Sequence, residues 1–167
     1  KISVDTNSKI NVNNAGSTIK TLAGEGTLNI NANTSVSGLF GSASQIGTLA
    51  VNEGSTFILD SLDAVAEDEE EGIAARDEVN LTATTMEVFG TAIVADNNAN
   101  TITTTNVNKG GILDVGSNEF ASTVTLNDGA TLNIGFANDV PAEGEVTTVK
   151  NGSVKELKGS KTEGDKA

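Results

Sequence analysis

The chain has 167 residues and a formal charge of −13, from 23 acidic and 10 basic side chains. Because it contains no Cys and no His, thiol and imidazole nucleophiles, disulfides and the usual zinc, copper and haem ligands are excluded. The negative charge would repel the phosphates of nucleic acids and anionic lipids, and no apolar run reaches membrane-spanning length. We therefore predict no nucleic-acid partner and no membrane insertion by this segment.

The apolar residues favour strands. Val and Ile supply 26 residues and Leu supplies 11, against five Phe, one Met and no Trp or Tyr, so the core must be aliphatic. Asn, Thr, Gly and Ser together supply 71 residues and Pro supplies one. This composition is typical of many short strands joined by tight turns.

A phrase of nine residues recurs along the chain: an aliphatic residue, a polar pair, a Gly, and then an alternating strand. Its marker glycines are 28, 36, 20 and 19 residues apart. A step near 20 is typical of one coil of a β-solenoid, in which stacked coils bury a shared column of side chains. We therefore predict an all-β fold, a parallel β-helix (β-solenoid) with coils of about 20 residues over residues 1–149. The copies are Leu22–Ile30, Val51–Leu59, Met86–Val94, Val107–Val115 and Leu126–Ile134, and the markers are Gly26, Gly54, Gly90, Gly110 and Gly129.

Alternation within the copies predicts which side chains face inward. Turns are expected at Glu53-Gly54, Lys109-Gly110 and Asp128-Gly129, because Gly takes positive φ readily, and Asn beside the strands favours amide ladders along a parallel column. The alternative is an antiparallel β-sandwich, which also produces short alternating strands at regular spacing. The expected inward pairs are Leu28 and Ile30, Leu49 and Val51, Leu113 and Val115, Val124 and Leu126, and Leu132 and Ile134.

Residues 60–78 interrupt the repeat. They hold nine of the 23 acidic residues and only Arg76 in return, so we predict an acidic loop insertion with a short helical turn at Leu62–Ala66. Ca²⁺ binding is a weaker alternative, because the run lacks the ligand spacing of a calcium loop, and no resident cofactor is predicted. Loops that project from a rigid column commonly carry function, so this loop is the best candidate for partner binding. The candidate residues are Asp60, Asp63, Glu67, Asp68, Glu69, Glu70 and Glu71.

Residues 150–167 differ in composition from the repeats, with five Lys and three acidic residues. We predict a frayed last coil and a polar tail there. A solenoid with open ends exposes unpaired strand edges, so either further coils flank this segment or its ends pair with other copies of it.

Catalysis is not predicted. Polysaccharide-processing β-helices use close carboxylates, a basic residue as proton acceptor and aromatic side chains that stack on sugar rings, and this chain has one Arg and no Trp or Tyr. Asp96, Asp114 and Asp128 fall at comparable places in successive coils and could form a row, but Asp96 and Asp128 are more simply explained as turn residues. Threonine runs such as Thr82–Thr84 and Thr103–Thr105 are similar to the arrays of ice-binding solenoids. Such an array must recur at one place in every coil, and the sequence indicates no such recurrence.

Two phrases resemble the passenger repeats of Gram-negative autotransporters and related bacterial surface adhesins and surface-layer proteins. They are IGTLAVNEGSTFIL, residues 46–59, and STVTLNDGATLNIG, residues 122–135. The resemblance is carried by G-[ST]-L-x-[IV] and N-x-G turns, and it implies a secreted β-helix at the bacterial cell surface, associated with the outer membrane. It also implies a host or neighbouring-cell surface protein or glycan as the partner.

Two functions are expected from these observations. The first is a non-enzymatic adhesive or structural stalk, in which the coils give length and rigidity and the acidic insertion meets the partner. The second is a self-assembling surface-layer or filament subunit, whose partner is another copy of the chain and whose exposed edges pair between copies.

Overall fold

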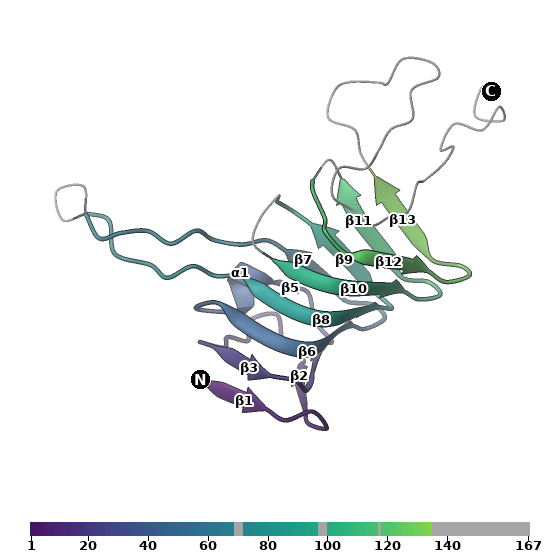
Figure 1. Ribbon diagram of the computed structural model, residues 1–167, viewed down its shortest axis with the longest axis horizontal. Coiled ribbons are helices and arrows are strands. Elements are labelled where there is room, and N and C mark those ends of the chain that lie inside the picture. Colours follow the sequence, from purple (N-terminus) through teal and green to yellow (C-terminus); the bar gives the residue numbers. More distant parts are fainter. Residues whose placement is uncertain (69–71, 97–99, 117, 135–167) are drawn as a thin grey trace, which may run out of the picture.

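A computed structural model describes residues 1–68, 72–96, 100–116 and 118–134 (Figure 1). They form a β-solenoid of about six turns, in which corresponding strands lie about 20 residues apart. All pairs between the named strands are parallel, which confirms the predicted parallel β-helix and excludes the antiparallel sandwich. The predicted frayed coil and tail at residues 150–167, and the end of the predicted solenoid at residues 135–149, lie outside the described residues.

Two parallel sheets run along the column, and a third, of two strands, lies at its N-terminal end. In spatial order, the six-stranded sheet contains β12 (Thr123–Leu126), β10 (Thr101–Val107), β8 (Leu81–Val88), β6 (Ser44–Val51), β4 (Thr27–Ile30) and β2 (Lys9–Val12). The five-stranded sheet contains β13 (Thr131–Ile134), β11 (Ile112–Gly116), β9 (Thr91–Val94), β7 (Thr56–Leu59) and β5 (Thr34–Ser35). At the N-terminal end, β1 (Ile2–Val4) pairs with β3 (Leu22–Gly24), and the helix α1 (Val36–Leu39) follows β5.

Side chains from successive coils stack in register to form the core. One column of the six-stranded sheet begins at Val12, which is 2% exposed, and passes through three fully buried Val residues. Each buried side chain of this size contributes on the order of 1.5–3 kcal/mol, and stacking lets every coil bury its apolar face on the next. The column consists of Val12, Ile30, Val51, Val88, Val107 and Leu126.

The last described coil is only partly covered. The predicted inward side chains of the earlier coils are buried, whereas Leu126 is 44% exposed and its in-register neighbour Val107 is fully buried. Val124, Leu132 and Ile134 are half-buried. The predicted inward orientation of these side chains is therefore confirmed. Their burial is lower in the last described coil because no further described coil packs on it.

The first copy of the repeated phrase is not equivalent to the others. Thr27–Ile30 and Thr131–Ile134 have the same sequence, Thr-Leu-Asn-Ile, yet β4 belongs to the six-stranded sheet and β13 to the five-stranded sheet. β4 pairs with Thr48–Val51 of β6, which precedes the Gly54 turn, and not with β7, which follows it. The predicted alignment of Leu22–Ile30 with Val51–Leu59 is therefore wrong, because alternation alone does not select one sheet over the other.

Glycines shape the turns between the two large sheets. Gly54, Gly110 and Gly129 have φ values of 78°, 81° and 78°, which confirms the three predicted turns. Gly90 lies in a shorter turn, where glycine is required by a close contact with the preceding coil and not by a positive φ. A Cβ added there would lie 2.3 Å from the carbonyl oxygen of Asn52, so the close approach of the preceding coil requires glycine.

Candidate functional site

The acidic insertion forms a two-chain arm that projects from the side of the column (Figure 1). We define the acidic arm as the described residues 60–68 and 72–80. Its two chains run antiparallel and are bridged at Leu62 and Val79, at Val65 and Arg76, and at Asp68 and Ile73. The backbone hydrogen bonds of these bridges are 2.8 to 3.0 Å long. The predicted helical turn at Leu62–Ala66 is therefore wrong.

The two chains of the arm pair with each other instead of forming a helix, because this pairing begins at an apolar pair of residues that packs on the hydrophobic core. Val79 is buried, and Leu62 packs against the hydrophobic core beside it. This apolar pair fixes the base of the arm, and each bridge then satisfies an N–H and a C=O on both chains. A helix of five residues would bury little apolar surface and is marginal by itself.

The base of the arm is pinned to the coils on both sides of it. The carboxylate of Asp60 accepts hydrogen bonds from the backbone N of Ser37, at 2.9 Å, and from the Ser37 hydroxyl. The backbone N of Ser61 donates to Asp96 Oδ2 at 2.7 Å. Nδ2 of Asn100 donates to the carbonyl oxygen of Asp60 at 2.9 Å. The arm therefore leaves the column in a direction fixed by the preceding and following coils.

The predicted partner-binding residues divide into an anchor and an exposed set. Asp60 is half-buried and its carboxylate is occupied by Ser37, so it is part of the anchor. Asp63, Glu67 and Asp68 are exposed on the first chain of the arm. Glu69, Glu70 and Glu71 lie outside the described residues.

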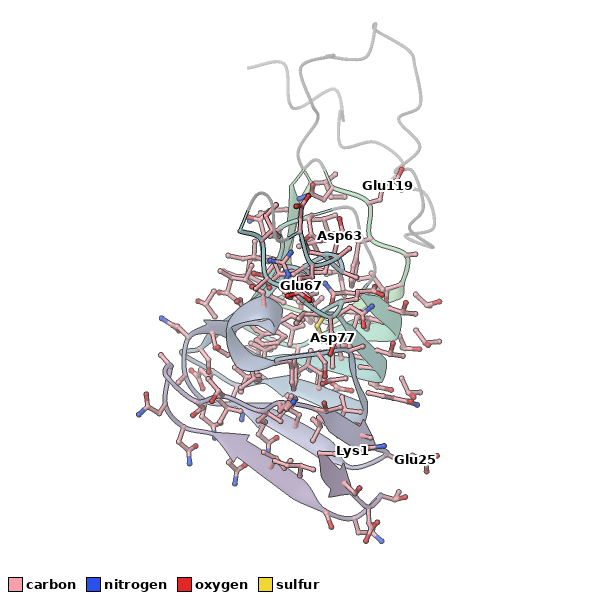
Figure 2. All side chains as sticks on the ribbon, turned by 90° about the vertical axis from the view of Figure 1, so that its left-hand side faces the viewer. Lys1, Glu25, Asp63, Glu67, Asp77 and Glu119 are labelled. Carbon is pink, nitrogen blue, oxygen red and sulfur yellow. The ribbon has the colours of Figure 1, made fainter. Side chains whose placement is uncertain are left out.

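Two further acidic residues belong to the exposed set. Asp77 and Glu78 stand on the returning chain, and both are exposed. Figure 2, viewed from the side toward which the arm projects, shows Asp63, Glu67 and Asp77 near its centre. The sequence prediction named only the first half of the acidic run. Antiparallel pairing brings the second half beside it, and that pairing was not predicted.

Arg76 is the basic residue of the arm, and it stabilises the arm from within. Its Nη2 donates to the carbonyl oxygen of Asp63 at 3.0 Å and its Nε donates to the same oxygen at 3.3 Å. Within the described ranges, no group of three acidic residues could hold a metal ion. The exposed carboxylates thus form an extended negative surface, and Ca²⁺ binding there stays an untested prediction.

Asparagine amides form a ladder at the carboxyl ends of the strands of the six-stranded sheet, where each of these asparagines is the first residue after its strand. Asn31 Nδ2 donates to Asn13 Oδ1 at 2.7 Å, and Asn52 Nδ2 donates to Asn31 Oδ1. Nearer the C-terminal end, Asn127 Nδ2 donates to Asn108 Oδ1 at 3.0 Å. In each bond the donor belongs to the later coil, so the ladder has one direction along the column.

Phe89 interrupts the ladder. Because Val51, Val88 and Val107 are in register, Phe89 takes the place between Asn52 and Asn108. Glu87 compensates: its carboxylate accepts from Asn106 Nδ2 at 2.7 Å and from Asn108 Nδ2 at 2.8 Å. The ladder therefore keeps its direction beyond Phe89, with a charged acceptor in place of an amide.

A threonine column also recurs on this sheet, so the prediction of no recurrence is wrong. The sequence hides it because in-register threonines are separated by 21, 37 and then 19 residues. A second threonine rank is only partial: Thr82 and Thr101 are in register on one side of the column, but Gln45 takes the equivalent place in β6. On the other side the positions two residues further along the strands include Ala50 and Glu87, so we do not propose an ice-binding face. The column consists of Thr27, Thr48, Thr85, Thr104 and Thr123.

The suggested carboxylate row does not form. Asp114 lies in register with Ile93 and Asn133, and its Oδ1 accepts from the backbone N of Gly116 at 3.0 Å. Asp96 accepts from Ser61 at the base of the arm, and Asp128 is exposed in a turn. Each of the three has a local position of its own, and they share no site.

Comparison of the chain with protein-family models, with curated proteins and with solved structures gives no match. Within the described part of the chain, no helix is long and apolar enough to cross a membrane.

Proposed function

We propose that this chain is a non-enzymatic segment of a secreted bacterial surface protein, associated with the outer membrane, in which the solenoid is a rigid stalk and the acidic arm meets a partner. The observation that carries the proposal is the pinning of the arm through Asp60 and Ser61 to the coils on either side. A projecting surface held in one orientation loses little conformational entropy when it binds. The resemblance of the repeat phrases to surface adhesins supports the location.

The column has the properties that a stalk needs. Its apolar core continues from Val4 to Val115 through a single cluster of buried residues. The sheets and the asparagine ladders both run along the axis, so bending the column would break hydrogen bonds between successive coils. Stiffness therefore comes from the same contacts that fold the chain.

The partner is a surface protein or glycan of a host or neighbouring cell, and the acidic arm favours one that presents basic groups. Asp63, Glu67 and Asp77 are exposed, so each contact with a basic group contributes about 1 kcal/mol or less. Affinity would come from several contacts together and would fall as salt screens them. Electrostatic attraction would also raise the association rate.

The test measures binding of the whole chain to immobilised extracellular-matrix proteins and to a glycan array. The arm variant carries Asp63→Lys, Glu67→Lys and Asp77→Lys, and we expect it to bind at least tenfold more weakly than the unchanged chain. The matched control carries Glu25→Lys, Glu53→Lys and Asp128→Lys, which change the same number of exposed charges on the column. The control should bind normally. Equal loss in both variants, or no binding by the unchanged chain, would contradict the adhesive role of the arm.

The open ends of the column favour a second function, a self-assembling surface-layer or filament subunit. β2 and β12 are the outermost strands of the six-stranded sheet, and each pairs on one side only within the described residues. Exposed strand edges are templates for pairing with another chain. The observation specific to this function is the partial exposure of Leu126 in the last described coil.

A further inference from the structure

We propose that the solenoid carries a second binding site, separate from the acidic arm, which takes an arginine side chain of a partner protein. The site lies at the carboxyl ends of the strands of the six-stranded sheet and consists of Phe89, Glu87 and Asn52. It goes beyond the proposed role of the arm and does not depend on it. Three observations support it: an exposed aromatic ring interrupts the amide ladder, the neighbouring amide nitrogens already donate within the protein, and acceptor capacity remains beside the ring.

Phe89 occupies a position of the amide ladder. Asn52, Phe89 and Asn108 each donate the backbone N to the last strand residue of the preceding coil, at 2.8 to 3.0 Å, so their side chains leave the backbone in one row. An amide in place of Phe89 would donate to Asn52 and accept from Asn108, and a phenyl ring does neither. Because Phe89 is 42% exposed, its burial does not offset this loss. Local rules are most often broken in this way at functional sites.

The amide nitrogens around Phe89 are already engaged. Asn52 Nδ2 donates back along the ladder to the preceding coil. Asn106 Nδ2 and Asn108 Nδ2 donate to the two oxygens of Glu87, at 2.7 and 2.8 Å. A ligand that needs donors, such as a carboxylate or a phosphate group, is therefore disfavoured at this place. The formal charge of −13 on the chain disfavours it further.

Acceptors remain at the same place. Asn52 Oδ1 accepts from no described group, because Phe89 stands where the next donor of the ladder would be. The half-buried carboxylate of Glu87 accepts one hydrogen bond on each oxygen, and two carboxylate oxygens offer about four lone-pair positions. The face of an aromatic ring such as Phe89 is also electronegative. These three groups together favour a ligand that is positively charged and carries only donors.

An arginine side chain matches this set of groups better than a lysine side chain. Its guanidinium is planar, has five N–H donors and no acceptor, and stacks on aromatic rings while its edges donate to oxygens. Asn52 belongs to the coil before Phe89, and the Glu87 carboxylate is held by the amides of the coil after it. A guanidinium over Phe89 therefore has an acceptor on each side. The ammonium of lysine is a compact and more strongly hydrated charge, which does not stack in this way.

The site is distinct in position from the arm and is not filled by the neighbouring lysine. Lys109 directly follows Asn108, but its Cγ, Cδ and Cε lie 3.2 to 4.0 Å from the position that a Cβ would take on Gly129, in the following coil. Its side chain therefore runs away from Phe89. β8 begins at the base of the arm and ends just before Phe89, and its eight residues at about 3.3 Å each separate the two sites by roughly 26 Å.

The test is an NMR titration of the whole, isotopically labelled chain with a capped glycine–arginine–glycine peptide. The side-chain amides of Asn52, Asn106 and Asn108 report on the site, and the backbone amides of residues 63–67 report on the arm. We expect saturable shifts of the three asparagine amides, with a Kd in the millimolar range. The matching citrulline peptide keeps the planar shape without the charge and should bind at least fivefold more weakly, and the lysine peptide should also bind more weakly.

Phe89→Asn is the most informative variant, because it supplies the missing amide. The new side chain should donate to Asn52 and close the gap in the ladder, so the melting temperature should not fall, whereas arginine binding should weaken roughly tenfold. Phe89→Leu keeps an apolar side chain without an aromatic face and should weaken binding roughly three- to fivefold. Asp128→Asn is the matched control. It removes an exposed charge from a turn in a later coil and should leave the Kd within about twofold.

Several results would overturn the inference. A lower melting temperature of Phe89→Asn with unchanged binding would show that Phe89 is a structural residue. Equal binding of the arginine and citrulline peptides, or shifts of the same amides by neutral glucose, would show that the site does not select a cation. Shifts confined to residues 63–67, or no shifts at all, would also overturn it, the former leaving the role of the arm standing. Shifts at the three asparagines alone would support the inference and contradict the attraction of basic groups to the arm.

Discussion

The carboxylate of Asp60 accepts two hydrogen bonds from Ser37, one from its backbone N at 2.9 Å and one from its hydroxyl. Ser37 belongs to α1, in the coil before the arm, whereas Asp60 is the first residue of the arm itself. The most N-terminal carboxylate of the acidic run is thus a structural group, and the exposed carboxylates beyond it can change without loosening the base. Stability and binding can therefore be separated by mutation.

Asp60→Ala should lower the free energy of unfolding by about 1–3 kcal/mol, because it leaves the half-buried N–H of Ser37 without its acceptor. Urea denaturation followed by circular dichroism measures this change. Asp63→Ala is the control, since Asp63 is exposed, and its effect should stay within about 0.5 kcal/mol. Equal effects of the two substitutions would show that Asp60 is not the anchor.

Gly90→Ala should destabilise the chain more than Gly54→Ala. At Gly90 a Cβ would lie 2.3 Å from the carbonyl oxygen of Asn52 and 2.4 Å from that of Ser55, so the backbone of two coils must separate, at a cost of about 3 kcal/mol or more. At Gly54 no atom lies within 4 Å of the added Cβ, and only the φ of 78° is unfavourable, which costs about 1 kcal/mol. The midpoints of urea unfolding compare the two. The reverse order would contradict the close approach of these coils.

Glu87→Ala should cost about 1.5–3 kcal/mol, because Asn106 and Asn108 lose a charged acceptor that both amides share. Glu53→Ala changes the same charge in an exposed turn and should have little effect on the unfolding free energy. Thermal unfolding at matched ionic strength distinguishes the two variants. Similar losses would mean that net charge, and not the amide ladder, accounts for the effect.

Thr105→Val should destabilise although it makes the core more apolar. Thr105 is fully buried in the inward column, and its hydroxyl forms a hydrogen bond of 2.8 Å with that of Ser122, itself 3% exposed. Removing one hydroxyl breaks this bond at a cost of about 1 kcal/mol or more. Thr104→Val, one residue earlier on the outer face, is the matched control and should change the unfolding free energy by less than half as much. Chemical denaturation of both variants provides the comparison, and a stabilised Thr105→Val variant would contradict it.

Much of the fold could be predicted from local sequence. The step near 20 residues, the aliphatic alternation of Leu28 with Ile30, and the turn glycines at Gly54 and Gly110 together predict a parallel solenoid, and the structure confirms each of them. These signals succeed because each depends on a short-range rule: side chains alternate along a strand, and Gly tolerates positive φ.

Register and the path of the insertion could not be predicted in the same way. The tetrapeptide Thr-Leu-Asn-Ile occupies β4 in one sheet and β13 in another, and only packing against neighbouring coils distinguishes the two places. The threonine column is hidden for the same reason, because coils of unequal length shift equivalent residues along the sequence. The acidic run showed where the chain leaves the column, but not that residues 60–68 and 72–80 pair with each other.

The sequence by itself determined the aliphatic alternation, the turns and the excess of negative charge, because these depend on residue type and on neighbours along the chain. The tertiary structure decided which asparagines share a ladder, in which direction its hydrogen bonds run, and that Asp60 is an anchor while Asp63 is exposed. Those properties depend on contacts between residues about 20 or more positions apart, which form only when the coils stack.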